Sequence, residues 1–289
     1  MVSKRIARVF PRRTEATPND ELAFVGTQPP MPFFKDGVIP WPEEVHVSCT
    51  FTWDRPAAEM LALWWQEVGV PVKLGGPAYG EPSGEFVPGM YVKHGYTITS
   101  RGCPNNCPFC SVPKREGGLR ELLVHPGHNV LDDNLLACSD GHIRAVFDML
   151  KAQPERPRFT GGFEAAQLVQ KTWVVDHLRE LRPKGMYFAY DMPDKYEALV
   201  EAGKLLRAGG FTAESHEVSC YVLVGFFPDD TPERAEKRLK DAWRAGFFPY
   251  AMLYRDEHGR IPEDWEDFYK GWDRPQKVAT QLQGIEVMT

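Results

Sequence analysis

The sequence predicts an α/β protein in which a small α/β layer precedes a larger parallel sheet that is curved or closed. Between residues 91 and 256, apolar segments alternate with helical segments, a pattern typical of parallel strands covered by helices. A shorter strand–helix–strand pattern lies before them. We therefore expect an N-terminal α/β region over residues 1–90, the larger unit over 91–256 and a C-terminal extension over 257–289.

Composition and charge exclude several classes of protein. Hydrophobic residues make up 43% of the chain and charged residues 26%. Both values are close to globular averages, so the chain is neither disordered nor fibrous. A net charge of −6 argues against a protein that coats nucleic acid by bulk charge. No apolar run reaches the roughly 18 residues of a membrane span, and the basic N-terminus lacks the apolar core of a secretory signal.

The N-terminal layer is predicted from one strand–helix–strand unit. The apolar segment 43–51 is typical of a buried strand. Asp54 is expected to cap the helix that follows, with Pro56 in its first turn. A second strand over 71–76 completes the unit, and a short strand is expected over 22–26.

Six apolar segments predict the strands of the larger unit, and capping residues mark several of its helices. Pro193 opens a helix that Gly209 and Gly210 end, while Thr231 caps another helix that stops before Gly246. Binding sites on parallel sheets lie at the carboxyl ends of the strands, so we expect the functional site there. The predicted strands cover residues 91–99, 129–137, 158–162, 185–192, 216–226 and 248–254.

Three of the six cysteines, Cys103, Cys107 and Cys110, lie within eight residues after the first of these strands. Three thiolates at this spacing can hold three corners of a cubane iron–sulfur cluster, and soft thiolate ligands suit iron–sulfur or zinc. The other three cysteines lie in apolar segments, where cysteine acts as a small hydrophobic residue. This cysteine usage indicates a reducing compartment, so we expect a cytoplasmic protein.

The residues alone leave three interpretations of this cysteine segment open. A structural zinc site needs a fourth ligand, for which His125 and His128 are candidates. A fully ligated electron-transfer cluster needs a fourth cysteine, and Cys138 has no ferredoxin-like spacing. In the third interpretation, one iron stays open for a substrate or cofactor.

The segment TSRGCPNNCPFCSVP resembles the signature of radical S-adenosylmethionine (SAM) enzymes, whose pattern is Cys-x3-Cys-x-aromatic-Cys. Phe109 fills the aromatic position. The resemblance covers roughly residues 91–256, since RFTGGFEAAQL, MYFAYD and CYVLVGFFPDDTPERA are similar to strand ends of short radical SAM proteins, some of them encoded by phages. The N-terminal layer resembles a reduced form of the Rossmann-like domain of cobalamin-type and methylthiotransferase-type members. It lacks their Asp-x-His-x-x-Gly motif, so no cobalamin is predicted.

This resemblance implies a partial (β/α)6 barrel with a [4Fe–4S] cluster. Cys103, Cys107 and Cys110 would bind three irons, and the amino and carboxylate groups of SAM would chelate the fourth. Reductive cleavage of SAM would then yield a 5′-deoxyadenosyl radical that abstracts hydrogen from the substrate. An electron donor such as flavodoxin or ferredoxin is the implied protein partner.

The resemblance also implies residues that contact SAM. Phe109 would flank the adenine, and Asp133 or Asn134 would receive the amino group. Glu164 would reach the amino-acid moiety or the substrate, unless it is only a favourable helix-start residue. Asp191 would accept a ribose hydroxyl, unless it is an N-cap. The chain lacks the Gly-Gly-Glu element common after the second strand, which leaves the amino-group ligand open. Close backbone approach to the ligand is expected at Gly161 and Gly162.

Candidate substrate contacts lie beside the cysteines and at the end of the sixth strand. Lys114, Arg115 or Arg120 could pair with the SAM carboxylate or a substrate phosphate, although each also fits a solvated loop of mixed charge. Tyr254 and Arg255 are expected on the substrate side.

The substrate suggested by analogy is a nucleobase, a nucleotide or an amino-acid-decorated base in DNA. A radical SAM methyltransferase and an enzyme that modifies peptides or small molecules are alternatives within the class. No second cysteine triad is present, which argues against a methylthiotransferase. A non-catalytic iron–sulfur or zinc module is the alternative outside the class.

Overall fold

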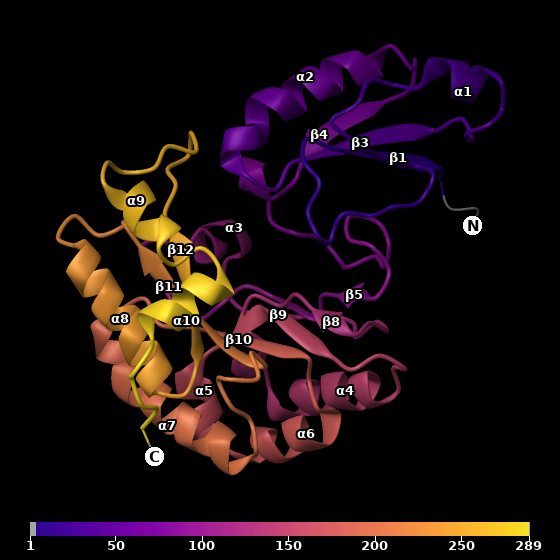
Figure 1. Cartoon of the computed structure of the whole chain (residues 1–289). Helices are drawn as coiled ribbons and strands as arrows, with labels where there is room; N and C mark the ends of the chain where they lie inside the picture. The colour runs from indigo at the N-terminus through magenta and orange to yellow at the C-terminus, as the bar shows by residue number, and fades with distance from the viewer. Residues whose placement is uncertain (1–3, 289) are drawn as a thin grey trace.

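The computed structural model describes residues 4–288 and contains two parallel sheets. A four-stranded sheet is built from the N-terminal region, and a six-stranded sheet from the chain after it (Figure 1). Every neighbouring pair of strands within these two sheets is parallel. The predicted α/β class is therefore confirmed.

The N-terminal sheet has the strand order β2-β1-β3-β4. Helix α2 packs Leu61 and Trp65 into one apolar cluster with Val45 and Val47 of β3. The sequence analysis did not predict β1, because its five residues, IARVF, carry an arginine in the middle and follow a basic N-terminus. The elements are β1 (Ile6–Phe10), β2 (Ala23–Val25), α1 (Met31–Lys35), β3 (Glu44–Ser48), η1 (Thr52–Asp54), α2 (Arg55–Gln66), β4 (Val72–Gly75) and η2 (Pro77–Tyr79).

The six-stranded sheet has the order β12-β11-β10-β9-β8-β5, so its strands follow one another in chain order. Each of them lies within or overlaps one of the six segments predicted as strands. A separate antiparallel pair, β6 (Ser100–Arg101) with β7 (Arg120–Glu121), encloses the cysteine segment. The six strands are β5 (Tyr96–Thr97), β8 (Asn129–Val130), β9 (Arg158–Phe163), β10 (Gly185–Ala189), β11 (Val218–Val224) and β12 (Phe248–Leu253).

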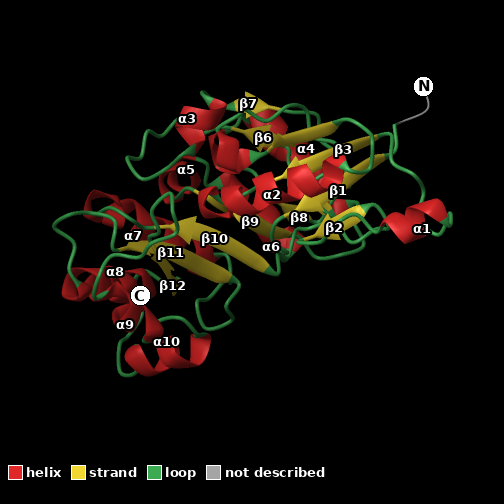
Figure 2. Ribbon diagram, turned by 90° about the horizontal axis from the view of Figure 1, so that it is seen from above, coloured by secondary structure: helices red, strands yellow, loops and turns green. Residues whose placement is uncertain are grey.

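Helices cover the face of this sheet that points away from the N-terminal layer, as Figure 1 shows for α4 to α7. Figure 2 gives the view from above, with α3, β6 and β7 along the upper edge of the picture and α9 and α10 at its lower edge. Phe147 and Leu150 of α4 pack into the main apolar core with Met186 and Phe188 of β10. The helical elements are α3 (Val112–Glu116), η3 (Leu135–Ala137), α4 (Asp140–Lys151), α5 (Ala165–Gln170), α6 (Trp173–Leu181), η4 (Pro193–Lys195), α7 (Tyr196–Ala208), α8 (Pro232–Arg244), α9 (Trp265–Lys270) and α10 (Pro275–Gln281).

The first two strands of the larger sheet are much shorter than predicted. Of the segments 91–99 and 129–137, only two residues each are strand, and the second segment ends in the short helix η3. The buried Asp132 carboxylate accepts hydrogen bonds from Thr99 N (2.6 Å) and Ser100 Oγ (2.8 Å). Side-chain bonds thus replace the strand ladder where both chains leave the sheet.

The predicted helix ends are mostly confirmed. Thr231 Oγ1 accepts a hydrogen bond from Arg234 N (3.3 Å) at the start of α8, and Gly246 follows its end. Asp54 occupies the N-cap position of α2 but makes no capping bond. Its carboxylate instead accepts two hydrogen bonds from Arg12 (2.8 Å each).

Within residues 4–288, none of the helices has the length and apolar character needed to cross a membrane.

Candidate functional site

Cys103, Cys107 and Cys110 lie on the loop between β6 and α3, at the carboxyl end of β5. Their thiols are free and partly exposed, whereas the other three cysteines are buried in apolar clusters. A hydrogen bond from Cys110 N to Cys107 O (3.1 Å) closes a tight turn between two of them. The loop therefore carries three accessible thiols, two of which flank this turn.

The electrostatics of this loop oppose three free thiolates. Burial raises the pKa of the Cys107 thiol, and the nearby Cys110 and Cys103 raise it further, followed by Asp191 and Glu164. Burial also raises the pKa of Cys110. A positively charged metal centre would offset this repulsion, since thiolates bind metals only after losing their protons.

No three His, Cys, Asp or Glu side chains in the described part of the chain are grouped closely enough to hold one metal ion. A four-iron cubane does not require the three thiols to meet at one ion, because each thiolate binds a separate iron at a separate corner of the cluster. Cys138 is no candidate for a fourth ligand at this loop: it is fully buried in the core, where burial raises its pKa to about 11. The histidines proposed for zinc lie elsewhere, with His125 against the Phe86 ring and His128 beside Glu155.

Asp133 anchors the start of the cysteine loop. Its carboxylate accepts a hydrogen bond from Gly102 N (2.9 Å) and lies 3.6 Å from Arg101 Nη1. Gly102 has a φ of +85°, and a Cβ on it would lie 2.3 Å from Gly118 O, so only glycine fits there. Asp133 therefore binds Arg101 and Gly102, the two residues that come directly before Cys103.

Asn134 links the cysteine loop to the end of β9. Its Nδ2 donates to Glu164 Oε2 (2.8 Å) and lies 3.4 Å from Cys103 Sγ. Its Oδ1 is buried and has no hydrogen-bond partner within residues 4–288. Glu164 makes no capping bond at the start of α5. Because buried polar atoms are normally paired, the Asn134 oxygen is a place where a ligand's N–H or ammonium group would fit.

The two glycines of β9 have different surroundings. Between the pairs Phe159–Met186 and Phe163–Phe188, β9 has three residues and β10 has one, so the strand bulges there. A Cβ on Gly161 would lie 2.0 Å from the Asp132 backbone oxygen, so this close approach is to the protein itself. Gly162 has a φ of +115°, and the nearest atom to a Cβ placed on it would be Tyr187 O, at 3.8 Å.

Asp191 lies at the end of β10 and connects it to β11. Its Oδ1 accepts a hydrogen bond from Leu223 N (2.7 Å), and Oδ2 has no hydrogen-bond partner among the described residues. Met192, not Asp191, is the N-cap of η4. Burial raises the pKa of Asp191 to about 6, although the Leu223 bond lowers it. This carboxyl group can accept or hold a proton near neutral pH.

Phe109 belongs to an aromatic cluster at the strand ends. Its ring centroid lies 5.7 Å from that of Phe226 and 6.2 Å from that of Phe227, and Tyr254 packs on Phe226 at 5.0 Å. Sequence reasoning identified Phe109 and Tyr254 separately. It missed the two phenylalanines after β11 that connect them.

Most of the cationic side chains predicted beside the site already bind other groups of the protein. Arg115 Nε donates to Glu116 Oε1 (2.9 Å), and Arg120 Nη2 donates to Glu116 Oε2 (3.1 Å). Lys114 is exposed. Arg255 is exposed as well and donates to the backbone oxygen of Gly259 (3.2 Å). Sequence reasoning missed the buried Glu116, because a short charged segment has the composition of a solvated loop.

In comparisons with known proteins, no protein-family model, curated protein or solved structure matches the chain.

Proposed function

We propose that this protein is a radical SAM enzyme that uses a [4Fe–4S] cluster to abstract hydrogen from an organic substrate. The observation that carries the proposal is the cysteine loop. It holds three free, partly exposed thiols, and Cys103 Sγ lies 3.4 Å from Asn134 Nδ2, while the buried Asn134 Oδ1 has no partner within residues 4–288. The loop is at the carboxyl edge of a parallel sheet, where such folds bind ligands.

The sheet supports the finer fold proposal, a partial (β/α)6 barrel. Its six parallel strands follow in chain order, and the edge strands β5 and β12 do not pair with each other in the described part of the chain. An incomplete barrel leaves one side of the strand ends accessible to a large substrate.

Cys103, Cys107 and Cys110 would hold three irons of the cluster. When bound together with SAM, the cluster supplies the electron that cleaves the sulfonium and yields a 5′-deoxyadenosyl radical. The remaining roles belong to the chain itself. Asn134 Oδ1 would accept an N–H of the SAM amino group, and Asp191 Oδ2 would accept a ribose hydroxyl.

The aromatic cluster would flank the adenine with Phe109 and exclude water from the reacting atoms. The substrate would then need to lie within about 3–4 Å of the radical carbon, so positioning is the main task of the protein. A nucleobase or an amino-acid-decorated base in DNA is the substrate class we propose, with a flavodoxin or ferredoxin as electron donor.

Metal analysis of two cysteine variants tests the proposed ligands. After anaerobic reconstitution, we expect about four irons and four sulfides per chain in the wild type. Cys107→Ala should lose the cluster, whereas Cys49→Ala, at a buried cysteine in the N-terminal core, should retain it.

Equal iron retention in both variants would overturn the ligand assignment. One zinc per chain without sulfide would instead indicate a structural metal module.

A further inference from the structure

Asp132 is a buried carboxylate that holds the segment leading into the cysteine loop. It accepts hydrogen bonds from Thr99 N (2.6 Å), Thr99 Oγ1 (2.5 Å) and Ser100 Oγ (2.8 Å). Only 1% of Asp132 is exposed, and no cationic side chain of residues 4–288 forms an ion pair with it. Because a buried charge normally needs an opposite charge nearby, its three neutral donors leave this carboxylate short of positive charge.

His142 reaches this carboxylate through one hydroxyl group. Its Nε2 lies 3.3 Å from Thr99 Oγ1. The single hydroxyl proton of Thr99 goes to Asp132, so the Thr99 oxygen acts as an acceptor toward the ring and Nε2 carries a hydrogen. Asp132, Thr99 and His142 therefore form a chain of hydrogen bonds.

The other ring nitrogen of His142 faces a second carboxylate. Nδ1 lies 3.9 Å from Glu121 Oε2, and the His142 side chain is only 8% exposed. Glu121 is on β7, opposite Ser100 of β6, and its Oε1 accepts a hydrogen bond from Ser139 N (2.6 Å), the N-cap of α4. A neutral ring with its hydrogen on Nε2 would direct a lone pair at Glu121, whereas the protonated ring directs an N–H at it.

The charges around the ring favour its protonated form on balance. Glu121 and Asp132 attract a positive ring, whereas the N-terminus of α4 and Lys171 repel it. Lys171 already lies 3.1 Å from an Asp140 oxygen, which offsets its charge. The titratable groups of the surrounding elements are Glu121 on β7, Asp132, Cys138 after η3, Asp140 on α4 and Lys171 after α5.

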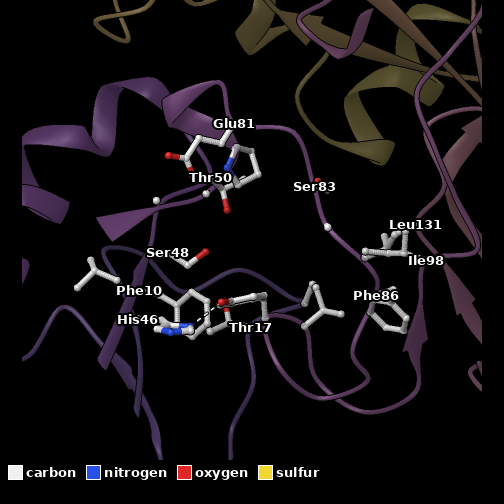
Figure 3. Close-up of a pocket in the computed structure, with 18 of the residues that line it drawn as sticks. Phe10, Thr17, His46, Ser48, Thr50, Glu81, Ser83, Phe86, Ile98 and Leu131 are labelled. Carbon is white, nitrogen blue, oxygen red and sulfur yellow. Dashed lines mark hydrogen bonds between the residues drawn. The ribbon is translucent and has the colours of Figure 1, made fainter. Parts of the chain in front are cut away.

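The chain of hydrogen bonds is shielded from the cavity that the N-terminal layer lines. Figure 3 shows Ile98 and Leu131 on the same side of that cavity. Thr99 and Asp132, the next residue on each segment, do not line it and are 0% and 1% exposed. Because little water reaches these bonds, a change in the charge of the ring is weakly screened at Asp132.

The residues that follow Asp132 extend its hold into the cysteine loop. Asp133 accepts a hydrogen bond from Gly102 N (2.9 Å), and Asn134 Nδ2 lies 3.4 Å from Cys103 Sγ. A shift of Asp132 is therefore passed to Cys103 through two neighbouring contacts.

We propose that His142 is a positioning residue, whose protonated ring acts through Thr99 to keep Asp132 charged and the start of the cysteine loop fixed. When the ring loses its proton, the bonds from Thr99 and Ser100 to Asp132 weaken and the loop loosens. Histidine ordinarily changes charge between pH of about 5 and about 8, so the loop is held more firmly at the acidic end of this range. The inference deepens the proposed function, since it concerns the loop that would carry the cluster.

Thiol reactivity of the full-length, metal-free protein tests this inference without the cluster. The probe is 4,4′-dithiodipyridine, applied at pH of about 5.5 and about 8, with modification of Cys103 followed by peptide mass spectrometry. At the lower pH, His142→Gln should react about three- to tenfold faster than the wild type. At the higher pH the two proteins should react equally fast, because both rings are then uncharged. Comparing the two proteins at each pH cancels the pH dependence of the thiol itself.

Glu121→Gln should show the same pattern, because it removes a carboxylate that favours the protonated ring. His258→Gln is the matched control: His258 also lies beside a glutamate, 3.6 Å from Glu257, but its side chain is 66% exposed. Its reactivity should equal that of the wild type at both pH values.

The same acceleration at both pH values would show a merely structural role, and unchanged reactivity in His142→Gln and Glu121→Gln would show none. Either result would overturn the proposal. A protein that shows the expected pattern but assembles no cluster would contradict the proposed function and support this inference.

Discussion

The fold raises the pKa of one carboxyl group, that of Asp191. Burial raises its pKa to about 6, and the hydrogen bond from Leu223 N only partly opposes this. Because the folded-state pKa is above the ordinary value of 3.8, the native chain holds a proton that the unfolded chain has released. The free energy of unfolding therefore falls as the pH rises from about 4 to about 6, and this loss persists above that window.

We expect Asp191→Asn to remove this pH dependence in the cluster-free protein, because the amide keeps the Oδ1 acceptor but does not titrate. Between pH of about 4 and about 7, the wild type should lose up to about 3 kcal/mol more unfolding free energy than the variant. Urea unfolding of both proteins at each pH measures the difference. Parallel pH profiles would show that the pKa is not raised.

At the residue scale, local patterns could be predicted from sequence and tertiary contacts could not. The cysteine triad is recognisable because its three thiols share eight residues. The Asn134 amide could be named as a candidate, but only the fold shows that Nδ2 binds Glu164 while Oδ1 has no partner within residues 4–288. Phe226 and Phe227 escaped notice because they contact Phe109 only when β11 reaches the same edge of the sheet.

Among the elements, α8 is held to the end of β11 by a buried ion pair. Arg238 donates two hydrogen bonds of 2.8 Å to Asp230, and a third of 2.9 Å to Leu223 O. Asp230 also accepts a hydrogen bond from Gly225 N (3.3 Å). The pair therefore fixes the loop that carries Phe226 in the aromatic cluster.

Asp230→Asn should lower the free energy of unfolding by about 3–5 kcal/mol, because it leaves the buried Arg238 charge uncompensated. Asp229→Asn is the control: its partner Arg234 is exposed, so the loss should stay below about 1 kcal/mol. Thermal or urea unfolding of the two variants gives the comparison. Similar losses in both would mean that the buried pair does not stabilise the fold.

In the six-stranded sheet the positions of the strands along the chain were predictable, but the lengths of the first two were not. The boundaries of α8 follow from Thr231 and Gly246, which act locally. The apolar residues of the segment 129–137 predict one continuous strand, yet the segment leaves the sheet after Val130. The cause is the Asp132 carboxylate, whose partners lie on a different segment of the chain.

In the whole molecule, Glu116 joins the N-terminal region to the cysteine loop. Its side chain is fully buried and accepts hydrogen bonds from Ser83 N (3.0 Å) and Ser83 Oγ (2.7 Å), as well as from Arg115. Burial alone would raise the pKa of Glu116, but the bonds from Arg115 and Ser83 lower it to about 2. Glu116 therefore stays ionised at physiological pH and connects α3 to Ser83 of the N-terminal region.

Glu116→Gln should lower the free energy of unfolding by about 2–3 kcal/mol, less than a fully buried pair because Arg115 and Arg120 are partly exposed. It should also speed alkylation of Cys110, because α3 loses its connection to Ser83. Glu67→Gln, at an exposed position, should change neither property. Unchanged stability and unchanged thiol reactivity in Glu116→Gln would contradict this connection.

The central claim, radical cleavage of SAM at the cysteine loop, is tested most directly by quantifying 5′-deoxyadenosine. The assay uses anaerobically reconstituted protein with SAM and dithionite, alone and with a panel of nucleosides, DNA and RNA. We predict release by the wild type, stimulated by one member of the panel, and no release by Cys107→Ala. Wild-type protein that carries about four irons per chain yet releases no 5′-deoxyadenosine under any of these conditions would contradict the account.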